Sequence, residues 1–188
     1  GQTRFFEVGN VHFDNNADLP EERKLLGVAF SGAGEDFFTL KGSLEALLAS
    51  FNMHERCTFV PGGGECFQPG QKALLLADGE PIGELGAIHP KVQKAWGIPE
   101  KVYYAEINVE KLRAHKGGKR TYEPLPRFPK VPRDIAVVVD ETVSAAAVKE
   151  AIEQAPAAVA IGDVELFDVY RGAGIPTGKK SMAYSFAL

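Results

Sequence analysis

The chain has 188 residues, of which 45% are hydrophobic and 24% are charged, and its formal net charge is −4. This composition can build a packed core of one large or two small domains, and it excludes a disordered chain. No apolar run approaches the ~20 residues that cross a bilayer, and the N-terminus has no signal-peptide pattern, so we expect no membrane partner. The only two cysteines, Cys57 and Cys66, do not make a disulfide framework and favour a reducing, cytoplasmic setting.

The first third of the chain predicts two strands and a helix. Residues 4–13 are rich in aromatic and β-branched residues, and residues 24–31 are a short apolar run bounded by Gly32 and Gly34; both patterns are typical of strands. Because the chain lacks an initiator Met and starts inside the first of these, we expect a fragment. One apolar stripe at helical spacing follows, with Thr39 as the expected N-cap and Asn52 as the expected stop. The stripe consists of Leu40, Leu44, Leu47, Leu48 and Phe51. We expect it to face the sheet.

A glycine-rich stretch covers residues 61–70. A phosphate-binding loop needs a strand before it and a helix after it, but strand-like residues follow here. The runs 72–77 and 81–88 flank Asp78-Gly79, a strong signal for a β-hairpin. The glycines are therefore interpreted as a turn.

His89 is the sharpest single candidate for chemistry in this part of the chain. It follows a predicted strand and precedes a short helix that Pro90 opens and Gly97 ends, and a histidine there can act as a base or a metal ligand. No nucleophile lies nearby in the sequence, however, and no spacing of His, Cys and Asp is typical of zinc. Capping of the helix is the favoured interpretation. The sequence therefore predicts no catalytic residue and no metal site.

A basic stretch follows the next predicted strand, residues 102–109. Six basic residues fall within ten positions: Lys111, Arg113, His115, Lys116, Lys119 and Arg120. A solvated basic linker is the favoured interpretation, and a local phosphate-binding patch is the alternative. The change in composition places a linker at 115–121, between domains at 1–114 and 122–188.

The second domain begins with an extended arm, because residues 122–132 hold four prolines. We expect strands at 133–140, 164–170 and 181–188, with a helix after the first of them that Ser144 caps and that ends before Pro156. The order strand, helix, strand, strand is most of a split βαβ unit, without its last helix and strand. The predicted fold class is therefore α+β.

Basic and aromatic residues in this domain resemble the requirements of single-stranded RNA recognition, which combines stacking rings with positive charge. The candidates in the arm and beside the last turn are Arg127, Phe128, Lys130, Arg133, Arg171, Lys179 and Lys180.

Several segments, in this order, carry a family likeness. They read RFFEVGNVHF, DFFTLKGSLEALL, FQPGQKALLL, GELGAIHP and YYAEINVEKL, then YEPLPRFPKVPRDIAVVVD and LFDVYRGAGIPTGKKSMAYSFAL. Together they resemble the beta subunit of bacterial phenylalanyl-tRNA synthetases over nearly the whole chain. One departure is that this chain has Gln68 and Gln71 where the family often has His and Arg.

The resemblance implies a fold and a function. Residues 1–114 would be the C-terminal part of an antiparallel-sheet class II synthetase-like module without catalysis. Residues 122–188 would be an incomplete ferredoxin-fold anticodon-binding domain. The whole enzyme joins phenylalanine to its tRNA with ATP and magnesium as an (αβ)₂ tetramer, and the alpha subunit performs the chemistry. This fragment would supply subunit scaffold and tRNA anticodon-region binding, with no cofactor of its own.

Two alternatives stay open: a stand-alone protein-interaction module with no RNA role, and an independent enzyme that uses His89. The ferredoxin-like strand order also carries an expectation. The missing last strand would leave the strand at 133–140 on an open edge, which is a template for pairing. We expect either self-association of the fragment, exchange of elements between copies, or a mobile half-domain.

Overall fold

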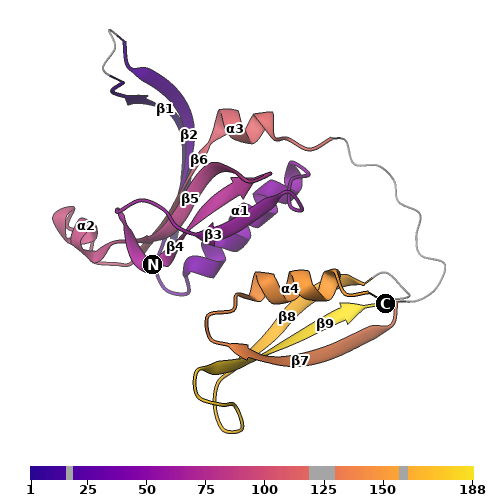
Figure 1. Ribbon diagram of the computed structural model, residues 1–188. Helices are drawn as coiled ribbons and strands as arrows, with labels where there is room; N and C mark the ends of the chain where they lie inside the picture. The colour runs from indigo at the N-terminus through magenta and orange to yellow at the C-terminus, as the bar shows by residue number, and fades with distance from the viewer. Residues whose placement is uncertain (16–18, 119–129, 157–160) are drawn as a thin grey trace. The chain divides into compact units, whose positions relative to one another are not determined.

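A computed structural model describes residues 1–15, 19–118, 130–156 and 161–188 (Figure 1). The chain divides into two compact units, Gly1–Thr121 and Tyr122–Leu188. Both are α+β, and every strand pair in the two sheets is antiparallel. In the described part of the chain, no helix is both long and apolar enough to span a membrane.

Unit 1 is built on a six-stranded sheet of order β1-β2-β6-β5-β4-β3. Its elements are β1 (Thr3–Phe13), β2 (Glu21–Ser31), α1 (Phe37–Ser50), β3 (Cys57–Pro61), β4 (Phe67–Ala77), β5 (Glu80–Ile88), α2 (Pro90–Ala95), β6 (Val102–Asn108) and α3 (Val109–Ala114). The hairpin predicted at Asp78-Gly79 is confirmed, and it joins β4 to β5. Both turn residues have positive φ, 49° and 83°, as a two-residue type I′ turn requires.

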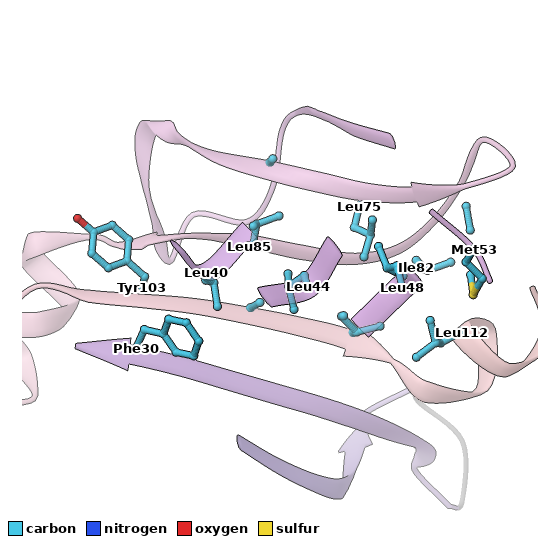
Figure 2. Close-up of a cluster of buried hydrophobic side chains, with 14 of the residues drawn as sticks. Phe30, Leu40, Leu44, Leu48, Met53, Leu75, Ile82, Leu85, Tyr103 and Leu112 are labelled. Atoms are coloured by element: carbon cyan, nitrogen blue, oxygen red, sulfur yellow. The ribbon is translucent and has the colours of Figure 1, made fainter. Parts of the chain in front are cut away.

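The core of unit 1 lies between α1 and the sheet (Figure 2). The apolar stripe of α1 supplies Leu40, Leu44 and Leu48, each at most 2% exposed, while Leu47 and Phe51 pack at its margin. The predicted placement of this stripe is therefore confirmed. Burial of such large aliphatic side chains is the main stabilising contribution in a unit of this size.

The start of α1 differs from the sequence prediction. Asp36, not Thr39, is the N-cap: the Asp36 carboxylate accepts the Thr39 N–H at 2.7 Å, and the Thr39 hydroxyl accepts the Asp36 N–H at 2.8 Å. The two residues thus form a reciprocal capping box, in which Thr39 takes the third helical position. The helix gains one turn at its N-terminus compared with the prediction.

Unit 2 has a three-stranded sheet of order β7-β9-β8, with one helix on one face (Figure 1). Its elements are β7 (Pro132–Asp140), α4 (Ala145–Glu153), β8 (Gly162–Tyr170) and β9 (Lys179–Ala187). Ser144 caps α4 as predicted, since its hydroxyl accepts the Ala147 N–H at 3.2 Å. This arrangement is consistent with a ferredoxin-like fold.

The small core of unit 2 holds Val148 of α4, Val164 of β8, and Met182 and Tyr184 of β9. The Tyr184 hydroxyl donates to the Ala145 carbonyl at 2.9 Å, which satisfies a buried polar group and ties β9 to α4. Because side chains alternate along a strand, the neighbours of Met182 and Tyr184 in β9 lie on the opposite, helix-free face.

Candidate nucleic-acid interface

The predicted RNA-binding residues fall into separate groups. Arg127 and Phe128 lie outside the residues that the structure describes. Lys130 is exposed and takes part in an interaction of its own. Arg133 is exposed at the start of β7, where its Nη1 donates to the Pro132 carbonyl at 3.1 Å.

Strand register separates Arg133 from the cations near the turn between β8 and β9. Arg133 pairs with Phe186, whereas Lys180 pairs with Val139 at the other end of β7. Six residues of strand at ~3.3 Å each place the two ends roughly 20 Å apart. Among the described cations, the structure therefore places Arg133 apart from Lys179 and Lys180.

Carboxylates neutralise most of the positive charge beside that turn. Arg171 binds Glu141 through Nε at 3.0 Å and Nη2 at 2.5 Å, and Lys179 Nζ lies 2.7 Å from Asp140. The hydrogen bond from Arg171 holds the pKa of Glu141 below its usual value. Lys180 is only 8% exposed and donates to the Glu141 carbonyl at 2.8 Å, so its role is structural. Arg171 and Lys179 are the exposed cations of this group.

Strand β8 carries a feature that the sequence analysis missed. Phe167 is 57% exposed and Tyr170 is 47% exposed. Tyr170 pairs with Ser181 of β9, and Phe167 is the extra residue of a bulge between the pairs Leu166–Tyr184 and Asp168–Ala183. Exposed rings of this kind are suited to stacking on unpaired bases.

The centre of the helix-free face has no protruding side chains, because β9 presents only small side chains there. Ser181, Ala183 and Ser185 alternate with the buried Met182 and Tyr184. The flanking strands add carboxylates, since Asp134 and Glu165 both pair with Ser185 and Asp168 pairs with Ala183. Negative charge repels phosphate, so this face favours the flat surface of a base over the nucleic-acid backbone.

The three successive glycines of unit 1, Gly62–Gly64, lie in the connection between β3 and β4, as the sequence predicted, whereas residues 67–70 of the glycine-rich stretch belong to β4. Their backbone is held by side chains of the sheet: the Glu84 carboxylate accepts the Gly64 N–H at 2.8 Å, and Lys72 Nζ donates to the carbonyls of Gly63 and Gly64 at 2.7 and 3.0 Å. A carboxylate where a phosphate would bind excludes a phosphate loop at this position. Gln71, one of the two departures from the family pattern, accepts from Lys101 Nζ at 2.8 Å.

Groups with potential for catalysis in unit 1 have structural roles. His89 caps α2, with its Nδ1 accepting the Lys91 N–H at 3.1 Å, which confirms the favoured interpretation. Burial raises the pKa of the Cys57 and Cys66 thiols, which makes both of them poor nucleophiles. Among the residues that the structure describes, no group of three or more His, Cys, Asp or Glu side chains has the arrangement of a metal site.

Part of the basic stretch at the end of unit 1 is also neutralised, while Arg113 and Lys116 are exposed. Lys111 Nζ lies 2.8 Å from Glu80, and the His115 ring contacts both Asp78 and Glu80. Lys119 and Arg120 lie outside the described residues. A phosphate-binding patch at this position is therefore not favoured by the described side chains.

Comparison with known proteins decides the family. A family model described as the phenylalanyl tRNA synthetase beta chain CLM domain matches residues 1–109. The chain belongs to the phenylalanyl-tRNA synthetase beta chain family. A second model, described as the ferredoxin-fold anticodon binding domain, matches residues 126–188. The resemblance inferred from the sequence is thus confirmed for both parts of the chain.

Relatives named as phenylalanine–tRNA ligase beta subunits match almost the whole chain. Those of Clostridium tetani and Halalkalibacterium halodurans are each 39% identical to it, over 97% and 96% of its length, and that of Geobacillus kaustophilus is 38% identical over 96%. The matched part is 23%, 24% and 24% of these relatives, respectively. The chain therefore spans about a quarter of the length of the curated relatives that it matches.

Proposed function

We propose that this chain is part of the beta subunit of a phenylalanine–tRNA ligase, and that it supplies subunit scaffold and tRNA binding rather than chemistry. One observation carries the proposal: beta subunits of phenylalanine–tRNA ligases match 96–97% of the chain, with a beta-chain model on unit 1 and an anticodon-binding-domain model on unit 2. The protein would then act in protein biosynthesis, in the cytoplasm.

Unit 1 would be the scaffold. We assign residues 1–114 to the C-terminal part of a catalytically inactive class II synthetase-like module, followed by a basic linker at 115–121. Its antiparallel sheet, with α1 packed on one face, supports this assignment. The helix-capping role of His89 and the raised thiol pKa values of Cys57 and Cys66 support a module without a nucleophile or a base.

Unit 2 would bind the anticodon region of tRNA. Phe167 and Tyr170 are exposed on β8 and would stack on unpaired bases. Arg133, Arg171 and Lys179 are exposed at the two ends of the sheet, where they would contact the phosphates that flank those bases. Arg127, Phe128 and Lys130 of the preceding arm remain candidates from the sequence.

The partners of the whole enzyme follow from the same proposal. The alpha subunit would perform the reaction in an (αβ)₂ tetramer, with ATP as substrate and magnesium as cofactor. Among the described residues of this chain, no group of three or more His, Cys, Asp or Glu side chains could hold a metal ion.

The test uses the complete αβ enzyme with Phe167→Ala and Tyr170→Ala combined. We expect the KM for phenylalanine-specific tRNA to rise at least tenfold, since one stacked ring contributes about 1–3 kcal/mol. Phenylalanine-dependent exchange of pyrophosphate into ATP needs no tRNA and should stay unchanged. Trp96→Ala is the matched control, because Trp96 is an exposed aromatic residue of unit 1.

Other outcomes distinguish the alternatives. An unchanged KM for tRNA would contradict base stacking on unit 2 and favour a protein-interaction module. An equal loss of exchange and aminoacylation would show that the two rings have a structural role. Pyrophosphate exchange by this chain in the absence of the alpha subunit would contradict the scaffold role.

A further inference from the structure

The chain leaves unit 1 through residues 115–118, which we name the connector anchor. Its backbone is held by the segment that follows α1. The Gly117 N–H donates to the Phe51 carbonyl at 3.2 Å, Asn52 Nδ2 donates to the Gly118 carbonyl at 3.2 Å, and Arg56 Nη1 donates to the His115 carbonyl at 3.1 Å. A solvated linker, the favoured interpretation of the sequence, would need none of these bonds.

The side chain of His115 fastens the anchor to the turn between β4 and β5. Its Nδ1 lies 3.0 Å from Asp78 Oδ2, and its Nε2 lies 3.1 Å from Glu80 Oε2. A neutral imidazole has one N–H, so one of these two contacts would then oppose a nitrogen lone pair to a carboxylate oxygen. Only the imidazolium donates to both carboxylates. The geometry therefore selects the protonated ring.

The two carboxylates that contact the ring belong to one network of ion pairs. Asp78 and Glu80 face it from the turn, Arg56 binds Asp78 through Nε at 2.9 Å, and Lys111 of α3 binds Glu80 at 2.8 Å. The two carboxylates and the two cations balance each other. The proton on His115 is therefore the charge that can change near neutral pH.

Two residues that contact the connector anchor have a positive φ angle. In the described part of the chain, Asn52 and Asp78 are the two non-glycine residues with positive φ, at 58° and 49°, and both contact the anchor. A Cβ on Gly117 would lie 2.1 Å from the Asn52 carbonyl oxygen, so a side chain there would push the segments apart. Both conformations have local causes: Asn52 follows the C-cap of α1, and Asp78 is the first residue of the type I′ turn.

We propose that His115 is a proton-dependent clamp that fixes the point at which the connector leaves unit 1. With the ring protonated, the chain is held as far as Gly118. Loss of the proton removes one of the two hydrogen bonds to the turn and weakens the hold on residues 115–118.

The direction of the titration supports this clamp. The hydrogen bonds that the His115 ring donates to Glu80 and Asp78 raise the pKa of His115 above its ordinary value of 6.5. A raised pKa in the folded state means that the stabilisation is complete below pH 6.5 and is lost as the pH rises through the folded value. The pKa values of Asp78 and Glu80 are lowered by their cationic partners, so the carboxylates stay charged in mild acid.

Hydrogen exchange on the full chain tests the clamp. The protection factor of the Gly117 amide, corrected for intrinsic exchange, is measured from about pH 6 to pH 8.5, while NMR follows the His115 ring. We expect protection to fall at least tenfold with the midpoint of the ring titration. In His115→Gln it should be low at every pH. His54→Gln is the matched control, because His54 is exposed and only approaches Glu55, at 3.7 Å; it should behave as the wild type.

Amides of β5 and β6 report in each sample that unit 1 is folded. If Gly117 protection does not depend on pH in the wild type, the proton-dependent clamp is wrong, whatever the variants show. If His115→Gln keeps wild-type protection with those core amides intact, His115 does not hold the anchor. If the core amides of His115→Gln exchange freely, unit 1 of this variant is unfolded, and the pH dependence of Gly117 protection in the wild type then tests the clamp.

Discussion

Substitution of Leu44 by alanine tests the packing of α1 on the sheet of unit 1. Leu44 is 2% exposed, and leucine-to-alanine changes in cores cost about 2–5 kcal/mol, with a cost that grows with the closed cavity left behind. Leu44 also lines an apolar groove of about 530 Å³ between α1, α3 and the β1–β2 hairpin. Its removal enlarges an existing hollow instead of opening a closed one. We therefore expect a loss of about 2–3 kcal/mol in the free energy of unfolding.

Leu48 gives the internal comparison. It is equally buried but does not line the groove, so Leu48→Ala should cost about 3–5 kcal/mol. Phe38→Ala is the control, because Phe38 is 74% exposed on the same helix and its loss should change stability by less than about 0.5 kcal/mol.

The assay is urea unfolding followed through the β5 and β6 amides, which report unit 1 alone, since two units need not unfold together. A cost of less than about 0.5 kcal/mol for Leu44→Ala would refute the burial of the stripe. A larger cost for Leu44→Ala than for Leu48→Ala would refute the argument from the groove.

Three further predictions follow from the described contacts. Asp36→Ala removes the cap of α1 and should cost about 1 kcal/mol by urea unfolding, with faster exchange confined to the first turn of the helix. The pKa of Asp78 is lowered, so its ionised carboxylate stabilises the fold above the ordinary value of 3.8, and this stability is lost as the pH falls through the lowered value. Asp78→Asn should therefore flatten the acid side of a plot of urea midpoint against pH. An unchanged slope would contradict this. β7 pairs only with β9 among the described strands, so light scattering should detect self-association that Val138→Lys reduces; a strictly monomeric chain with a well-ordered unit 2 would contradict the open edge.

Local signals in the sequence predicted much of the fold. The spacing of Leu40, Leu44 and Leu48, the turn at Asp78-Gly79 and the cap at Ser144 each follow from interactions between residues close in the chain. The N-cap of α1 was missed because Asp36 and Thr39 are both capping residue types. Only the reciprocal hydrogen bonds between them show which one is the N-cap.

Features that depend on strand register could not be predicted. The distance between Arg133 and Lys180 depends on which residues of β7 and β9 pair, and the exposure of Phe167 depends on a bulge in β8. The connector anchor was interpreted as a solvated linker because its partners, Asn52 and Asp78 among them, are remote in sequence. A pattern of single residues does not encode such contacts.

Cross-linking of tRNA to the complete αβ enzyme tests the central claim most directly. Ultraviolet light joins unpaired bases to the aromatic residues on which they stack, and mass spectrometry then identifies the peptide. The account predicts cross-links between the anticodon loop and the β8 peptide that contains Phe167 and Tyr170, with none to the exposed Trp96 of unit 1. Anticodon-loop cross-links that fall only on unit 1, or that are unchanged when both rings of β8 are replaced by alanine, would contradict it.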